Sequence, residues 1–589
     1  MTNPSHIRAA ALAASAAIAA TACLLFIDFA EAGGFDMLDF VRAVLIFVSS
    51  LWLAWGSSVG IIGLVFRGTK PRVVTPLPHR QGKTAILVPV YNEDAVATFS
   101  RIAAINASLN KLNVTDRFHI AILSDSNSPE AIAEETIWFE RLLAEPNAIG
   151  RTFYRRRENN VGKKAGNVED FIRRSGGAYD YALVLDADSL MEGATIVEMA
   201  RRMDTDPELG LLQTLPRIIN ARSFFGRCMQ FSSHYLSPTF SRGIATLQGR
   251  EGPFWGHNAM IRVQAFAASC GLPELSGKPP FGGHILSHDY VEAAMLARAG
   301  WKVRLDPDLD GSYEEGPENL VEYAKRDRRW CQGNLQHHKL LAAPGLKLWS
   351  RLTFLHGIMA YLASPIWLML LAISVVAAAL PQRHYIPNID IENGAHAALN
   401  LAIGIGILLL LPKLLILIVS AFTGENKRFG GTFWALASVL VEIGYSTLLS
   451  PVQLLLQSRA VSQVLLGLDG GWPATQRSQS RVDLHDAWAA GWWMVVFGFA
   501  TLAVVLAFTP HIVVWMLPAV VPMMAAPLLI AAGSHSRKDG HPVLFTTPLE
   551  REPTPVMVER ERILAAWRQE STTAPLRAVI LEATSHVGA

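Results

Sequence analysis

The feature that most constrains the fold is the distribution of long apolar segments along the 589 residues. A helix that crosses the ~30 Å hydrocarbon core of a bilayer needs about 20 consecutive, mostly apolar residues. The segments that meet this requirement are 9–27, 44–66, 355–380, 395–422, 487–508 and 512–532. No such segment occurs between Arg67 and Arg351. The sequence therefore predicts a multi-pass α-helical membrane protein with one large hydrophilic insert.

The overall composition supports a membrane protein and argues against one class of partner. Hydrophobic residues make up 51% of the chain and charged residues 17%, whereas about a quarter of a typical soluble protein is charged. The net charge of +2 gives no electrostatic case for nucleic acid as a partner. The cysteines have no metal-type spacing, so we interpret them as small apolar residues, mostly in a reducing compartment. They are Cys23, Cys228, Cys270 and Cys331.

Charges in the short loops predict the orientation of the insert. Lys and Arg are enriched in cytosolic loops. The loop 29–40 contains acidic residues but no Lys or Arg, whereas Arg67, Lys70 and Arg72 follow the second apolar segment. Lys347 precedes the third. We therefore expect the insert to be cytosolic, and the resemblance described below implies a bacterial inner membrane.

Two segments allow more than one interpretation. Residues 1–34 are also compatible with a cleaved signal peptide, because Arg8 precedes an Ala-rich run. Residues 432–468 are apolar but contain Glu442, Pro451 and Arg459, and positive loops flank both ends. Flanks on the same side require an even number of crossings. This segment is therefore either a hairpin of two short spans or an amphipathic segment at the membrane interface.

These patterns divide the chain into four parts. The predicted parts are an N-terminal membrane segment (1–67), a cytosolic domain (68–350), a C-terminal membrane block (351–535) with an interfacial or gating segment near 432–486, and a cytosolic tail (536–589).

The insert has the sequence pattern of an α/β domain. Short β-rich apolar runs alternate with helical stretches, which predicts a mostly parallel sheet. The expected strands are 84–90, 119–124, 181–185 and 210–213, and the expected helices include 129–144 and 166–175.

Carboxylates follow three of the expected strands. Glu93 follows the first strand, Asp125 the second, and Asp186 with Asp188 the third. Ligands of open α/β sheets bind at the carboxyl ends of the strands. A cluster of carboxylates is unfavourable without compensating cations, and Mg²⁺ prefers one or two carboxylates plus phosphate oxygens. We therefore expect a site for a divalent metal and a diphosphate, although any one of these residues alone would be interpreted as a turn or helix cap.

Basic residues elsewhere in the insert carry weaker signals. Lys163 and Lys164 precede an expected helix and could lie near phosphate groups, although a lysine pair is usually solvated. The arginines at 155–157 could also lie near phosphate groups, but a solvated strand end is at least as good an interpretation of this run.

Two further motifs lie near the end of the insert. Asp289 opens a helical stretch at 290–299 and is either a helix cap or a general base for a hydroxyl group. Arg326 and Arg329 are three residues apart and share a helix face, where they could neutralise a diphosphate. Trp330 offers a flat surface for a sugar ring, whereas Lys325 and Arg328 also fit a basic helix held by anionic lipid.

In this order, these motifs resemble the processive family 2 glycosyltransferases, which include cellulose and hyaluronan synthases. A closer resemblance is to the branch that makes the backbone of osmoregulated periplasmic glucans in Gram-negative bacteria. The segments 123–130, 255–262, 285–294 and 325–331 carry it. Arg326 stands where cellulose synthases have Gln, and Ser287-His288 replaces Thr-Glu before Asp289, so acceptor geometry cannot be copied from cellulose synthase.

The resemblance implies a GT-A-type, Rossmann-like glycosyltransferase domain with specific residue roles. The implied nucleotide-sugar ligands are Tyr91, Glu93, Asp125, Lys164, Asp186, Arg326 and Arg329. Asp186 and Asp188 are the implied metal ligands for Mg²⁺, with Mn²⁺ as the alternative. Asp289 is the implied base, and Trp330, Trp255 and His257 the implied acceptor-binding residues.

The implied reaction is inverting transfer of glucose from UDP-glucose to a growing β-1,2-glucan, with passage of the product through the membrane block. The implied partners are membrane lipids, acyl carrier protein and periplasmic glucan-modifying proteins. Arg477 lies in a Gly/Pro-rich segment that by analogy closes over bound UDP, and Trp488, Trp492 and Trp493 either line the channel or anchor at the interface. The alternatives are a synthase of another β-glycan and a transporter with a regulatory domain. The sequence contains no Gly-x-x-x-x-Gly-Lys-Ser/Thr loop for ATP-driven transport.

Overall fold

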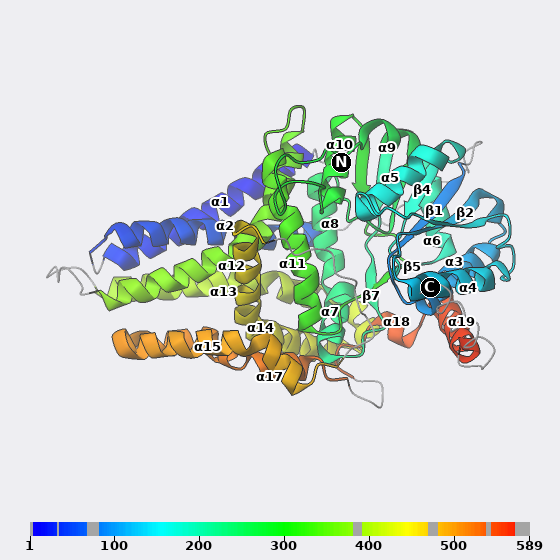
Figure 1. Cartoon of the computed structure of the whole chain (residues 1–589). Coiled ribbons are helices and arrows are strands. Elements are labelled where there is room, and N and C mark those ends of the chain that lie inside the picture. The colour runs from blue at the N-terminus through cyan, green and yellow to red at the C-terminus, as the bar shows by residue number, and fades with distance from the viewer. Residues whose placement is uncertain are drawn as a thin grey trace.

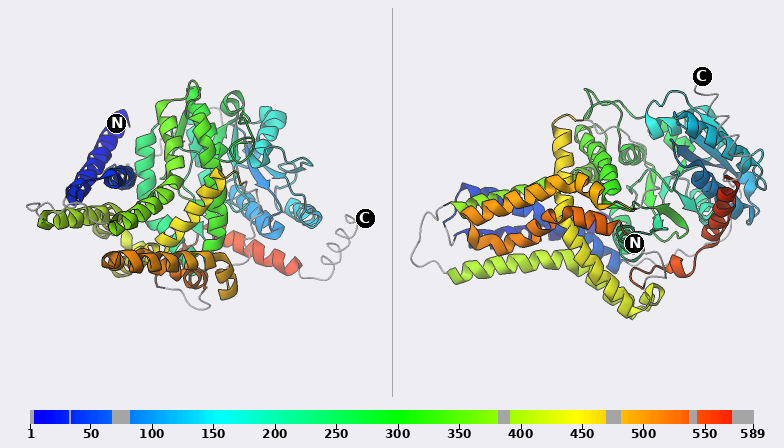
Figure 2. Two further views of the ribbon diagram at one scale, coloured as in Figure 1. Left: turned by 60° about the vertical axis from the view of Figure 1, so that its left-hand side comes forward. Right: turned by 60° about the horizontal axis from the view of Figure 1, so that its bottom comes forward.

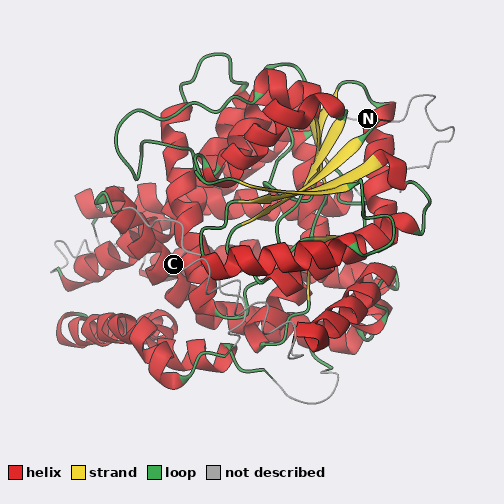
Figure 3. Cartoon of the chain, turned by 45° about the vertical axis from the view of Figure 1, so that its right-hand side comes forward, coloured by secondary structure: helices red, strands yellow, loops and turns green. Residues whose placement is uncertain are grey.

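A sheet of seven strands forms the centre of the insert, and Figure 3 shows this sheet between helices. The computed structural model describes residues 4–31, 34–66, 82–380, 391–468, 481–536 and 543–571. The strands, in sheet order, are β3 (Thr152–Arg156), β2 (Phe118–Ser124), β1 (Thr84–Val90), β4 (Tyr181–Val184), β8 (Ala259–Arg262), β6 (Leu209–Gln213) and β9 (Lys302–Leu305). β8 is antiparallel to both neighbours, and the other pairs are parallel. The expected strands and the mostly parallel sheet are confirmed; the antiparallel β8 was not predicted.

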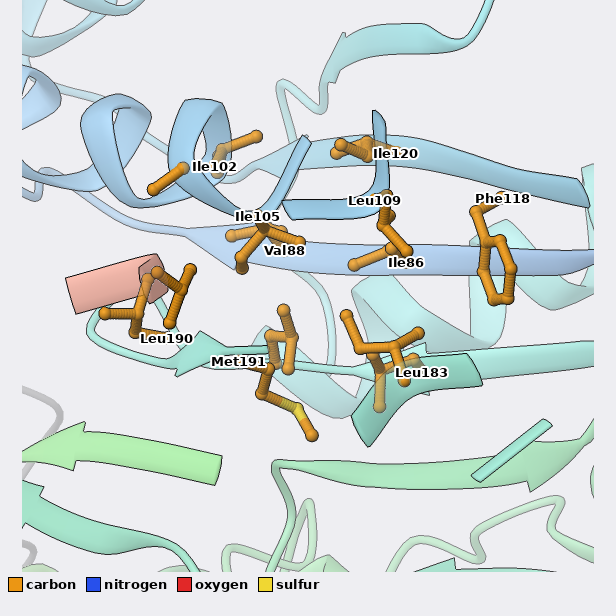
Figure 4. Close-up of a cluster of buried hydrophobic side chains, with 14 of the residues drawn as sticks. Ile86, Val88, Ile102, Ile105, Leu109, Phe118, Ile120, Leu183, Leu190 and Met191 are labelled. Carbon is orange, nitrogen blue, oxygen red and sulfur yellow. The ribbon is translucent and has the colours of Figure 1, made fainter. Parts of the chain in front are cut away.

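Helices cover both faces of this sheet, which explains why β1 is apolar from Ala85 to Val90. Successive side chains of a strand point to opposite faces. Ile86 and Val88 join one core cluster with residues of α3 (Ala95–Asn110), shown in Figure 4, whereas Leu87 joins the cluster on the other face. The remaining domain helices are α4 (Pro129–Leu143), α5 (Lys163–Ser175), α6 (Gly193–Thr205), α7 (Phe224–Tyr235), α8 (Ser237–Gln248), α9 (Val263–Ser269), α10 (His288–Arg298) and α11 (Leu320–Gln336).

A small second sheet and a C-terminal helix complete the domain. The strands β5 (Leu190–Met191), β10 (Ser312–Glu315) and β7 (Arg217–Ile219) form the small sheet. α18 (Pro548–Arg551) leads to α19 (Pro555–Ser571), which contributes Trp567 to the main core of the domain. The rings of Trp567 and Trp138 stack with centroids 5.2 Å apart. Part of the stretch assigned to a tail therefore belongs to the domain core.

Six segments of the described residues have the length and apolarity for a crossing at the expected places, and together with α14 below they are called the membrane block. They are α1 (Pro4–Glu31), α2 (Met37–Val65), α12 (Leu348–Ala379), α13 (Ile391–Phe422), α15 (Leu484–Phe508), and the pair α16 (Val513–Met524) and α17 (Ala526–Gly533). The last pair is bent by 56°. Figures 1 and 2 show the α/β domain at one end of this bundle.

The ambiguous segment forms one continuous helix, α14 (Thr432–Leu465), which also has the length and composition of a span. Both of its ends contact the α/β domain. Tyr235 of α7 donates a hydrogen bond to Asn426 Oδ1 at 2.7 Å, and Arg328 of α11 donates one to Leu468 O at 2.7 Å. Figure 1 shows α14 running across the direction of α12, α13 and α15. The continuous helix excludes the two-span hairpin, and its ends fit the interfacial alternative.

A close crossing of α2 and α8 fixes the domain on the membrane block. A Cβ atom on Gly63 would lie 1.8 Å from Thr239 O, and one on Gly243 would lie 2.0 Å from Val59 O. Only glycine permits the two backbones to approach this closely.

We expect Trp567→Ala to destabilise the α/β domain. The Trp567 side chain is 1% exposed, and truncating such a residue to alanine typically costs about 3–5 kcal/mol. The thermal unfolding midpoint of the purified protein should fall clearly. Arg568→Ala, at the exposed neighbouring position, is the matched control, and equal midpoints for both variants would contradict the docking of α19.

The topology predicts which positions share one side of the membrane. Cysteines at Lys427 and Leu468, which flank α14, should react with an impermeant maleimide from the same side. A cysteine at His511, in the turn between α15 and α16, should react from the opposite side. Labelling of membrane vesicles of both orientations, above the background of the native cysteines, measures this. Reaction of positions 427 and 468 from opposite sides would show that α14 crosses the membrane.

Candidate active site

The ends of β1 and β2 bring together the first group of predicted residues. Asn127 Nδ2 donates to the Tyr91 hydroxyl at 3.4 Å, and half-buried Glu93 follows in the same turn. Asp125 is 5% exposed and accepts two hydrogen bonds from Arg157, at 2.7 and 2.8 Å. Such a bidentate pair is a strong, charge-assisted contact. Arg157 is therefore part of this group, although its run of arginines suggested a solvated strand end.

Lys164 and the aspartates after β4 form the second group. Lys164 Nζ contacts Asp186 and donates to Gly256 O at 2.6 Å. Asp186 N–H donates to Ser189 Oγ at 2.9 Å, and Asp188 is 3% exposed. The Lys164 ammonium compensates the negative charge of Asp186. A divalent cation could bind the same carboxylate, since Mg²⁺ and Mn²⁺ favour carboxylate oxygens. The donor set therefore fits such a metal.

Asp289 lies in the first turn of α10. Ser287 is the N-cap residue of this helix, so Asp289 is not its cap. Burial raises the pKa of Asp289, and the charge of Glu292 raises it further, whereas His288 opposes the shift. A carboxylate with a raised pKa is a stronger proton acceptor once it is ionised.

α11 carries the third group on one face. The Arg326 guanidinium lies 4.5 Å from the centre of the Trp330 ring, a cation–π contact. Trp330 is 41% exposed, so its ring has free surface for a ligand. Asp327, on the other side of the helix, accepts hydrogen bonds from Tyr361 of α12 at 3.2 Å and Gln457 of α14 at 3.1 Å.

The turn before β8 contributes Trp255 and His257. Trp255 N–H donates to Gln213 Oε1 at 3.0 Å, and His257 Nε2 lies 3.5 Å from Glu314 of β10. Burial raises the pKa of Glu314; His257 and Arg326 oppose this shift, whereas Asp188 and Asp186 add to it. Glu314 was not predicted, because no motif of the sequence marks it.

One cavity of about 820 Å³ joins most of these residues. Its lining includes the predicted residues Lys164, Asp186, Trp255, His257, Asp289, Arg326, Arg329 and Trp330. It continues to His356 of α12 and to Tyr445 and Gln453 of α14. The cavity therefore reaches from the domain into the membrane block.

The other predicted residues lie beside this cavity or elsewhere. Tyr91, Glu93, Asp125 and Asp188 are not among its lining residues. Trp488 and Trp492 are exposed and also do not line it, whereas Trp493 lies under the guanidinium of Arg459. Arg477 lies outside the described residues.

The family models and solved structures that this chain resembles are glycosyltransferases. Two family profiles match, "Glycosyl transferase family 2" over residues 85–269 and "Glycosyl transferase family group 2" over residues 181–385. Among solved structures, a mannosyltransferase of Pyrobaculum calidifontis in complex with GDP-Man and Mn²⁺ is similar with a TM-score of 0.42. It is 16% identical, and the match covers 63% of this chain and 92% of that one.

Curated relatives extend the similarity to the whole chain. Glucans biosynthesis glucosyltransferase H of Cereibacter sphaeroides is 52% identical over 100% of this chain and 98% of the relative. The protein of the same name from Caulobacter vibrioides is 39% identical over 89% of this chain and 82% of the relative. The chain is thus a membrane-embedded family 2 glycosyltransferase, and it belongs to the glucans biosynthesis glucosyltransferase H family.

Proposed function

We propose that this enzyme polymerises glucose from UDP-glucose into the β-1,2-linked backbone of osmoregulated periplasmic glucans and moves the product across the inner membrane. The observation that carries the proposal is the single cavity that holds Asp289, Asp186 and Trp330 and continues into the membrane helices. A soluble transferase would not need such a continuation.

The donor side of the proposed site combines the first two groups. Tyr91, Glu93 and Asp125 bind the uridine, with Asp125 held by Arg157. Lys164, Arg326 and Arg329 supply positive charge for the diphosphate. Asp186 and Asp188 would hold Mg²⁺ or Mn²⁺, and such an ion would neutralise charge on the diphosphate leaving group.

The acceptor side uses Asp289 as the base. The carboxylate takes the proton of one acceptor hydroxyl while that oxygen forms a bond to the anomeric carbon of glucose. The bond between this carbon and the phosphate oxygen breaks, and its electron pair leaves with UDP. A single displacement inverts the α-linked donor to a β-glucoside. Trp255, His257 and Trp330 hold the acceptor sugar.

The orientation follows from the loop charges. The domain faces the cytosol, where UDP-glucose is made, and the glucan leaves along α12 and α14. Acyl carrier protein and periplasmic glucan-modifying proteins are the proposed helpers, and Arg477 is the proposed gating residue.

We expect Asp289→Asn to lower turnover about 10²–10⁴-fold, because the amide cannot accept the proton. UDP affinity should stay within about twofold, since Asp289 acts on the acceptor. Radiolabelled glucose incorporation by purified protein and UDP binding by calorimetry measure the two quantities.

The wild-type pH profile provides a second readout of the same residue. Protonation of Asp289 stops the reaction, and burial raises its pKa above 3.8. The rate should therefore fall as the pH drops through a value above that of an ordinary aspartate, and this acidic limb should vanish in Asp289→Asn. Asp310→Asn, at a side chain that is 86% exposed, is the control and should match the wild type. Full glucan synthesis by Asp289→Asn would refute the assignment of the base.

A further inference from the structure

Strand β10 places two consecutive glutamates in different surroundings. Glu315 accepts contacts from Arg101 at 2.7 Å and from Arg560 of α19 at 3.1 Å. Burial alone would raise its pKa, but these two guanidinium groups lower the pKa of Glu315 to about 2. Glu315 thus ties β10 to α3 and α19 and fixes the position of the strand.

Glu314 has no comparable ion pair with an arginine in the described part of the chain. Its printed contact is His257 Nε2 at 3.5 Å, longer than a good hydrogen bond. The side chain lines the cavity together with Asp186 and Trp330. A half-buried carboxylate with unused acceptor capacity toward a cavity is suited to bind hydroxyl groups of a ligand.

The turn that contains Gly256 and His257 connects Glu314 to the proposed base. A Cβ atom on Gly256, where φ is +82°, would lie 3.7 Å from Asp289 Oδ2. The next residue, His257, contacts Glu314. Asp289 and Glu314 therefore flank the same turn and border the same cavity.

We infer that Glu314, beside the acceptor-binding residue His257, binds hydroxyl groups of the terminal acceptor glucose and thereby selects the hydroxyl that meets Asp289. This inference rests on the proposed function. Sugar hydroxyls donate to a carboxylate in charge-assisted hydrogen bonds, while Trp330 offers its face to the ring. A site built to bind a particular hydroxyl discriminates strongly against other orientations.

The competing role for Glu314 is that of a third metal ligand, because the charges of Asp186 and Asp188 act on it. The two roles predict different defects. Loss of a metal ligand raises the metal concentration needed for activity, whereas loss of an acceptor ligand lets water replace the sugar at the anomeric carbon.

The test compares Glu314→Gln with the wild type in purified full-length protein. UDP release and incorporation of labelled glucose are measured together, because their ratio reports transfer to water against transfer to glucan. We expect this ratio to rise at least about tenfold in Glu314→Gln. The KM for UDP-glucose and the Mn²⁺ concentration for half-maximal activity should stay within about twofold.

Three further variants make the comparison specific. Asp188→Asn should raise the Mn²⁺ requirement and serves as the standard for a metal-ligand defect. Glu322→Gln removes a carboxylate from the α11 wall of the cavity and should keep the wild-type ratio. Glu314→Asp retains the carboxylate and should recover part of the transfer to glucan.

The outcomes separate the two levels of the proposal. An unchanged ratio in Glu314→Gln, or an Mn²⁺ requirement raised as in Asp188→Asn, overturns the role of Glu314 alone. If Glu314→Gln is inactive, two results together support acceptor binding by Glu314: the variant binds UDP with Mn²⁺ normally, and Glu314→Asp recovers part of the transfer to glucan. Failure of either result overturns this role. If the wild type makes no glucan from UDP-glucose, the proposed function itself fails.

Discussion

The arrangement depends on α11, which connects the chemistry of the domain to the membrane block. One face of this helix presents Arg326, Arg329 and Trp330 to the cavity. The other face holds Asp327 against Tyr361 and Gln457, and burial raises the pKa of Asp327. Because the helix is rigid, the position of Asp327 among the membrane-block helices fixes the position of the arginines over the proposed donor site. The proposed active site and the proposed product path are thus aligned by one element.

Charge balance is the second constraint on the site. Asp125, Asp186, Asp188, Asp289 and Glu314 would repel one another without compensation. Arg157 neutralises Asp125, and Lys164 contacts Asp186. Basic side chains of the protein therefore compensate part of the negative charge of these carboxylates. A bound diphosphate would add negative charge, and a divalent metal would add positive charge.

The parts of the fold that local sequence determines could be predicted. The apolar β-rich run is enough to predict β1, and the end of that run predicts the position of Glu93. Both predictions depend only on residues that are close together in the sequence. Trp567 could not be placed, since its burial depends on α3 and α4, which lie far away in the sequence. Hydrophobicity also could not give the direction of α14, because apolar residues suit a crossing helix and an interfacial one alike.

The same distinction applies to the site. Asp186, Asp289 and Trp330 belong to recognisable motifs, and the structure brings them to one cavity. Glu314 has no motif, and its proximity to His257 arises because the neighbouring Asn258 donates hydrogen bonds to Ser312 Oγ and Tyr313 O of β10, a contact that only the three-dimensional fold reveals. The bond between Asp125 and Arg157 likewise follows from the parallel pairing of β2 with β3.

The most direct measurement is the linkage of the product made by the purified protein from UDP-glucose and Mg²⁺. Methylation analysis of the labelled polymer identifies which hydroxyl of each glucose is substituted. We expect 2-substituted glucose in β-linkage, and no polymer when UDP-glucose is replaced by another sugar nucleotide. A 4-substituted glucan, or a polymer made only from another donor, would contradict the proposed function.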